Sequence, residues 1–128
     1  MKLLRIPVFL IAFFIAAAPA TADDNHLSQQ LVGLWMEYSP SSNLVSFDAD
    51  RKVKIFLKKG EIGDLRALAG TWAVKDGVMT ATFVSNGQSI SNAGKVTFEN
   101  GEMLLTDNNG VVTRHRRHTG PIPSQYVW

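Results

Sequence analysis

Short segments that alternate apolar and polar residues, separated by tight turns, constrain this chain more than any other feature. In residues 52–58 three aliphatic side chains alternate with lysines and a phenylalanine, which is the period-two pattern of a strand with one buried face. Asp76-Gly77 and Asn100-Gly101 each lie between two such segments, and these dipeptides favour two-residue hairpin turns. The pattern therefore predicts antiparallel strands that follow one another directly along the chain.

A Gly-x-Trp motif begins two of the expected strands. Gly33-Leu34-Trp35 opens the first strand, and Gly70-Thr71-Trp72 recurs near the middle of the chain. A buried tryptophan is a large apolar anchor, and truncating one to alanine costs about 3 to 5 kcal/mol. The repetition indicates one repetitive β domain in which the two motifs are fixed points.

The number of strands indicates a closed sheet. We count seven strands joined by short turns, together with residues 88–94, which are either a further strand or a loop. Eight consecutive antiparallel strands usually close because closure removes both open edges, whereas a sandwich would need longer crossing connections. Residues 61–68 alone have a helical pattern. We therefore expect an all-β fold, an up-and-down antiparallel meander that closes into a small eight-stranded barrel with one short helical turn.

The first 22 residues have the pattern of a secretory signal peptide. Lys2 and Arg5 precede an apolar run over residues 8–18, and Ala20-Thr21-Ala22 follows as a cleavage site. The run is shorter than the roughly 20 residues that span a bilayer. We therefore expect cleavage after Ala22, a periplasmic or secreted protein, and no stable membrane insertion after cleavage.

Composition narrows the class of protein further. There is no cysteine, so we expect no disulfide and no lipid carried by cysteine. Of the 13 Lys and Arg residues two belong to the signal peptide, and the remaining 11 balance 11 Asp and Glu residues. A neutral domain does not favour a nucleic-acid partner. The predicted parts are the signal peptide (1–22), a mobile lead-in (23–30), the barrel domain (31–118) and an extended, proline-containing tail (119–128).

The motifs together resemble a known family. Gly33-x-Trp35, Gly70-Thr71-Trp72, Met103-x-Leu105-x-Asp107 before an Asn-Gly turn, and arginines on the last strand are similar to the small bacterial lipocalin-like domains of the calycin group, over residues 31–117. The resemblance implies a barrel whose first-strand Trp packs at the closed end beside an arginine of the final strand. In this chain the implied barrel-closing residues are Gly33, Trp35, and Arg116 or Arg114.

The inward-facing apolar residues are the candidates for a ligand site. They are Trp35 or Met36, Phe47, Ile55, Trp72, Phe83, Val96 and Leu105. These residues either surround a small apolar or amphipathic ligand or simply pack the interior. Glu37 follows Trp35 on the same face, where it is either an internal charge at the ligand site or the partner of an arginine.

The densest polar run is Arg114-His115-Arg116-Arg117-His118. Alternation along a strand places His115 and His118 on opposite faces, which argues against a paired metal site. The basic residues Lys52, Lys54, Lys58 and Arg117 are either solvated charges or a patch for an anion or an acidic partner. The second interpretation supports an alternative function, a periplasmic interaction module (an inhibitor or accessory subunit) that uses the basic strand end and the tail.

Catalytic patterns are absent from the sequence. There is no cysteine, no serine within a Gly-x-Ser-x-Gly elbow and no glycine loop that would cradle a phosphate. The terminal Tyr126-Val127-Trp128 resembles an outer-membrane barrel signal, but lysines on the strand at 52–58 oppose that interpretation. We therefore expect an exported, soluble lipocalin-like protein, without enzymatic activity, catalytic residues, metal or cofactor, that binds a small apolar or amphipathic molecule.

Overall fold

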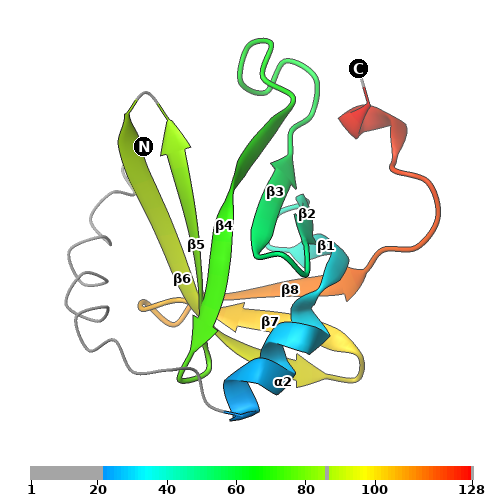
Figure 1. Cartoon of the computed structure of the whole chain (residues 1–128). Coiled ribbons are helices and arrows are strands. Elements are labelled where there is room, and N and C mark those ends of the chain that lie inside the picture. The colour runs from blue at the N-terminus through cyan, green and yellow to red at the C-terminus, as the bar shows by residue number, and fades with distance from the viewer. Residues whose placement is uncertain (1–21, 86, 128) are drawn as a thin grey trace.

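Eight antiparallel strands form a closed barrel in the computed structural model, which describes residues 22–85 and 87–127. Each strand pairs with the next along the chain, and β8 pairs back onto β1 (Figure 1). The strands are β1 (Gly33–Ser39), β2 (Leu44–Phe47), β3 (Lys52–Phe56), β4 (Ala67–Lys75), β5 (Val78–Ser85), β6 (Gln88–Glu99), β7 (Glu102–Thr106) and β8 (Val112–Arg117). The predicted all-β meander barrel is confirmed, and it is consistent with a lipocalin-like fold.

The predicted hairpins form with the expected turn geometry. Asp76 and Gly77 have φ angles of 54° and 78°, and Asn100 and Gly101 have 52° and 80°. Two successive positive φ values define the type I′ turn, whose twist matches that of the strands. Residues 88–94 are the first part of β6, and each of them pairs with a residue of β5, so this segment is a strand and not a loop.

The helix lies elsewhere than predicted. Residues 61–64 form tight turns beside a bridge between Gly60 and Gly63, and β4 already begins at Ala67, so the helical turn expected over 61–68 is wrong. The helix α2 instead spans Ala22–Leu31, where the sequence suggested a mobile lead-in. The expected signal peptide and its cleavage site lie almost wholly outside the described residues.

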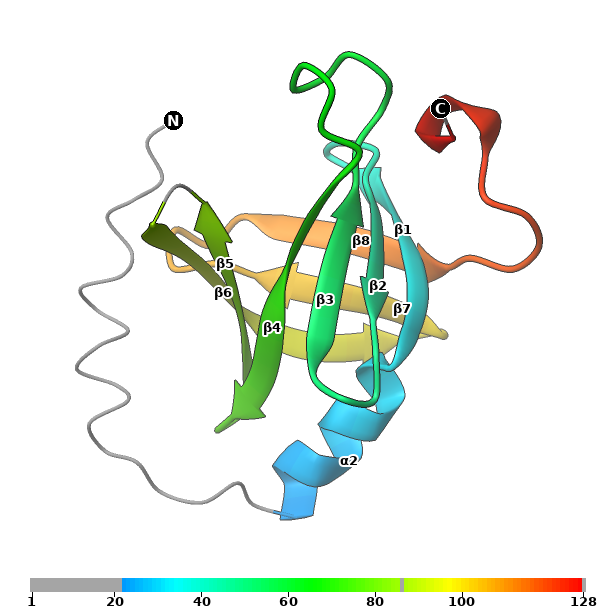
Figure 2. The same cartoon turned by 45° about the horizontal axis from the view of Figure 1, so that its top comes forward.

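Tertiary contacts fix α2 across one end of the barrel (Figure 2). The Asp24 carboxylate is 1% exposed and accepts hydrogen bonds from the backbone N–H groups of Asp76 and Gly77, at 2.8 and 2.9 Å. Leu31, at the other end of the helix, is fully buried. The helix therefore closes this end, and it ties the beginning of the domain to the β4–β5 turn.

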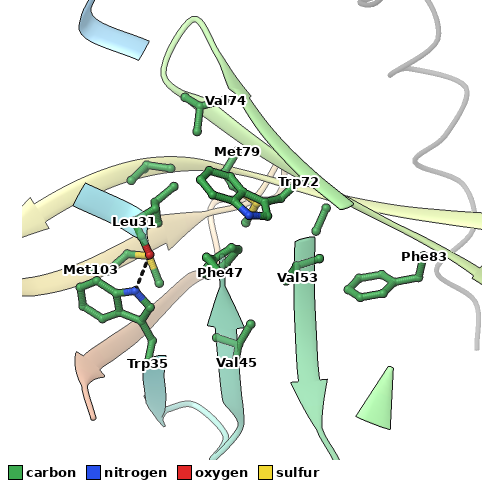
Figure 3. Close-up of a cluster of buried hydrophobic side chains, with 12 residues drawn as sticks. Leu31, Trp35, Val45, Phe47, Val53, Trp72, Val74, Met79, Phe83 and Met103 are labelled. Atoms are coloured by element: carbon green, nitrogen blue, oxygen red, sulfur yellow. Dashed lines mark hydrogen bonds between the residues drawn. The ribbon is translucent and has the colours of Figure 1, made fainter. Parts of the chain in front are cut away.

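The two Gly-x-Trp tryptophans have matching surroundings near this closed end. Trp35 Nε1 donates to the carbonyl of Leu31 at 2.8 Å (Figure 3), and Trp72 Nε1 donates to the carbonyl of Asp48 at 3.2 Å. A guanidinium also lies over each indole, that of Arg117 over Trp35 and that of Arg51 over Trp72. Buried indoles need such a partner for the N–H group, so the motif is repeated in its contacts as well as in its sequence.

Close contacts with other groups explain why both motifs begin with glycine. Gly33 has a φ of 139°, and a Cβ there would collide with the Arg117 guanidinium. A Cβ on Gly70 would collide with the Thr82 carbonyl of the neighbouring strand. Each glycine thus lets another group approach the backbone next to a tryptophan.

The tail returns to the outside of the barrel. After Pro123 the chain forms a short 3-10 helix, η1 (Ser124–Tyr126), so the prediction of an extended tail fails over its last residues. Tyr126 is buried, and its hydroxyl donates to the Ser42 carbonyl at 3.4 Å. Among the residues described, no helix is long and apolar enough to cross a membrane.

Candidate functional site

A cavity of about 210 Å³ lies inside the barrel and is lined by residues of every strand except β4. One part of its wall is apolar and consists of Val45, Phe47, Val53, Ile55, Met79, Ala81, Phe83 and Leu105. The other part is polar and consists of Glu37, Asn43, Asn92, Thr113 and His115. Pockets for drug-sized ligands are roughly 300–1,000 Å³, so this cavity suits a smaller molecule.

Small side chains leave this space open. Ala81 has the smallest side chain among the lining residues, and it faces Asn92 across the β5–β6 ladder. Near α2, in contrast, Trp35, Trp72 and neighbouring apolar side chains fill the interior (Figure 3). The barrel is therefore packed at one end and hollow further along.

The Glu37 carboxylate is held in this cavity by the β1–β2 loop. Its Oε1 accepts from Asn43 Nδ2 at 3.0 Å, and its Oε2 accepts from the Ser41 backbone N–H at 3.1 Å. Glu37 is only 8% exposed. An ionisable group buried to this degree is stable only because such hydrogen bonds replace water.

His115 lies opposite Glu37 in the β1–β8 ladder. The residue is 5% exposed, and its Nε2 is 3.9 Å from Glu37 Oε1, which is longer than a hydrogen bond. Burial lowers the pKa of His115, an effect opposed by the Glu37 carboxylate and more weakly by the carbonyls of Met103 and Thr113. Within the described part of the chain, the buried Nδ1 of His115 makes no hydrogen bond.

The predicted lining residues divide into two groups. Phe47, Ile55, Phe83 and Leu105 line the cavity. Trp35, Trp72 and Val96 do not line it; they lie in the buried core, to which Phe47 and Phe83 also belong. Met36 lies on the outer face of β1, where its sulfur accepts from the Tyr126 hydroxyl at 3.9 Å.

The arginine beside Trp35 is Arg117, so the choice of Arg114 or Arg116 as the barrel-closing residue is wrong. The Arg117 guanidinium lies 4.2 Å from the Trp35 ring centre and donates to the carbonyls of Gln30 and Val32, at 2.8 and 2.9 Å. It therefore also caps the carboxyl end of α2. Trp35 faces Arg117 in the strand register, which the sequence alone does not reveal.

Arg116 belongs to a separate cluster on the outer surface. Its Nε donates to Glu102 Oε2 at 3.0 Å, it stacks over the Tyr38 ring, and the Tyr38 hydroxyl also donates to Glu102. The hydrogen bonds from Tyr38 and Arg116 lower the pKa of Glu102, and the bond to Glu102 raises that of Arg116. Arg114 is exposed and pairs in the ladder with Leu104.

The four predicted patch residues do not gather on one surface. Arg117 lies at the α2 end, whereas Lys58 follows β3 at the opposite end and donates to Ser42 Oγ at 3.1 Å. Lys54 lies on the outer face of β3 over Phe56, and Lys52 is exposed at the start of that strand. These positions lower the support for a basic docking patch.

The site differs from the sequence prediction mainly in its polar half. Glu37 was recognised as a candidate internal charge, but its cross-strand neighbour is a histidine and not an arginine. Asn43, Asn92, Thr113 and His115 were missed, although strand alternation places Thr113 and His115 on one face. Among the described residues no three His, Asp or Glu side chains are grouped as metal ligands.

The structure defines a small β-barrel with an internal cavity that is partly apolar and partly polar. No protein-family model matches the sequence, and no curated protein matches it.

Proposed function

We propose that this protein is an exported, lipocalin-like carrier that binds a small amphipathic molecule inside its barrel. The observation that carries the proposal is the cavity of about 210 Å³, whose lining combines apolar side chains with buried Glu37 and His115. A core that serves only for packing gains nothing from two buried ionisable groups, because each costs desolvation energy. An amphipathic ligand would use both halves of the wall.

Two sequence features support the proposal. The motifs shared with the calycin group include the tryptophan and arginine that close one end of the barrel, although the arginine is Arg117. The signal-peptide pattern of residues 1–22 favours an extracytoplasmic protein. The export, the calycin membership and the lack of enzymatic activity stay predictions.

Filling the cavity tests the proposal directly. Ala81 lines the cavity, whereas its neighbour Ala73 is exposed on the outside of β4. Ala81→Phe should abolish binding of a neutral apolar probe such as octanol, measured by calorimetry, and Ala73→Phe should leave it unchanged. Equal binding by both variants, with circular dichroism showing a folded barrel in each, would contradict the proposal.

The natural ligand can be sought at the same time. Native mass spectrometry of the protein isolated from its own host reports bound small molecules and bound proteins together. A small molecule retained by the wild-type protein and lost in Ala81→Phe would identify the cargo.

The alternative, an interaction module, has less support. Arg116 and Arg117 are engaged within the chain, and the tail is held by Tyr126. Arg114 remains an exposed arginine at that strand end. Unchanged recovery of protein partners after Arg114→Glu would remove the motivation for this function.

A further inference from the structure

We infer that the cavity selects molecules that carry a protonated amine on a small apolar body, and that it rejects carboxylates of the same size. The inference rests on the proposed function, because it concerns the head group of the ligand that the cavity would hold. It follows from the hydrogen-bond donors and acceptors of the polar side chains that line the cavity. Some of them are already bonded within the protein, and the others are left for a ligand.

The carboxylate of Glu37 sets the charge of the polar wall. Both of its oxygens accept hydrogen bonds, from the neutral donors Asn43 Nδ2 and Ser41 N–H. A carboxylate has about four lone-pair positions, so acceptor capacity remains on both oxygens. Burial of this negative charge beside neutral groups favours a guest that brings a positive charge.

Two other polar side chains of the cavity, Asn43 and Thr113, already donate hydrogen bonds within the protein. Because a carboxylate only accepts, the amide atom of Asn43 that contacts Glu37 must be the nitrogen, and this leaves the amide oxygen as an acceptor. The Thr113 hydroxyl donates its hydrogen to the Leu105 carbonyl at 3.5 Å, so its oxygen also serves as an acceptor. The polar side chains around Glu37 are therefore rich in acceptors, while Asn92, on β6, offers both an amide donor and an amide acceptor.

His115 completes this wall as a neutral ring. Its burial favours the uncharged imidazole, which has one donor nitrogen and one acceptor nitrogen. Its Nε2 stands 3.9 Å from Glu37 Oε1, so one guest group can contact the ring and the carboxylate. An ammonium group has three donors and no acceptor, and it can contact the carboxylate and the ring together.

The residues that line the cavity include no Lys or Arg, within the part of the chain that the structure describes. Glu37 from β1 and His115 from β8 are the ionisable groups on this wall. A carboxylate guest would meet the charge of Glu37 without a compensating cation, and like charges in a desolvated site repel strongly. The wall therefore discriminates by the sign of the charge.

A matched series of probes tests this selectivity. Octylamine, octanol and octanoate share one chain and differ in the head group, and calorimetry at neutral pH gives the affinity of each. We expect octylamine to bind about ten- to a hundredfold more tightly than octanol, the usual gain for a charge-assisted hydrogen bond. Octanoate should bind most weakly.

Two variants with the same substitution locate the effect. Glu37→Gln should reduce octylamine affinity to about that of octanol and should leave octanol binding within about twofold, since one charge-assisted contact is lost. Glu102→Gln removes a carboxylate on the outside of the barrel and should leave the preference intact. If Glu37→Gln does not fold by circular dichroism, Thr113→Val is measured instead; it keeps the carboxylate and removes one neutral acceptor. Octylamine affinity should then fall relative to octanol by a smaller factor, about three- to tenfold, and no fall would count against the inference.

The outcomes separate the inference from the proposed function. If octanol or octanoate binds at least as tightly as octylamine, and Ala81→Phe abolishes that binding, the cavity is a ligand site and the inference is wrong. If none of the three probes binds the wild-type protein, the proposed function itself fails. An octylamine preference that survives in Glu37→Gln also overturns the inference.

Discussion

Arg117 connects three parts of the molecule through one side chain. Its guanidinium stacks on Trp35, caps the carbonyls at the end of α2, and belongs to the strand that closes the barrel. Arg117→Ala removes two hydrogen bonds and a stacking contact. We expect it to lower the free energy of unfolding by about 1 to 3 kcal/mol in urea titrations.

The neighbouring Arg114 provides the control, because it is exposed on the same strand. Arg114→Ala should change the free energy of unfolding by less than about 0.5 kcal/mol. Similar losses in the two variants would show that the contacts of Arg117 add nothing beyond an ordinary surface arginine.

His115 should make the stability of the barrel depend on pH. Burial lowers its pKa below the ordinary value of 6.5. Between the lowered pKa and 6.5 the unfolded chain binds a proton that the folded chain does not, so acidification through this range favours unfolding. We expect the urea concentration at the midpoint of unfolding to decrease as the pH is lowered from about 8 to about 5. In His115→Gln this decrease should be smaller.

His26 serves as the comparison, because its side chain is exposed on α2. His26→Gln should retain the pH dependence of the wild-type protein. If the stability of His115→Gln depended on pH as strongly as that of His26→Gln, burial of His115 would not be the cause of the pH dependence.

At the scale of elements, α2 depends on the Asp24 carboxylate. Asp24 joins the helix to the β4–β5 turn through two backbone N–H groups. Asp24→Ala leaves both donors without the carboxylate, and we expect a loss of about 1 to 3 kcal/mol in the free energy of unfolding. Hydrogen exchange should also quicken in α2 more than in the strands.

Asp23 is the matched control, one residue earlier and exposed. Asp23→Ala should leave both the unfolding free energy and the exchange of α2 nearly unchanged. Equal protection of α2 in the two variants would show that Asp24 does not hold the helix in place.

The strands were predictable from the sequence and the helix was not. Strands and hairpins follow from local rules, because alternation sets the buried face and Asp76-Gly77 or Asn100-Gly101 sets the turn. The buried stripe of α2 consists of Asp24, Leu27, Ser28 and Leu31, which has helical spacing. Because two of these four residues are polar, the sequence shows no apolar stripe that would predict a helix. The helix can be explained only once the contact of Asp24 with the β4–β5 turn is known.

At the scale of the whole molecule, ligand binding should raise thermal stability. A ligand that binds only the folded protein adds about 2.7 kcal/mol to the free energy of unfolding at 100 times its Kd. We expect octylamine to raise Tm by several degrees in the wild-type protein. Ala81→Phe, with its cavity filled, should show no rise, and an equal rise in both proteins would mean binding outside the cavity.

The candidate site was only half predictable because it depends on long-range register. Phe47, Ile55, Phe83 and Leu105 could be assigned inward from alternation alone. The pairing of Glu37 with His115, and of Trp35 with Arg117, depends on how the first strand aligns with the last. The ladder has an irregularity between Glu37 and Ser39, and no local pattern in the sequence reveals it.

The pairing of β1 with β8 also governs when the domain can be completed. In a nascent chain that stops before residue 112, β1 can pair with β2 but not with β8, and Trp35 and α2 lack the contacts of Arg117. Its first strand then keeps an open edge, and such edges invite aggregation and cleavage. Synthesis must therefore extend through β8 before a protease-resistant barrel exists, and chains that terminate earlier should be cleared by quality-control proteases instead of accumulating as partial barrels.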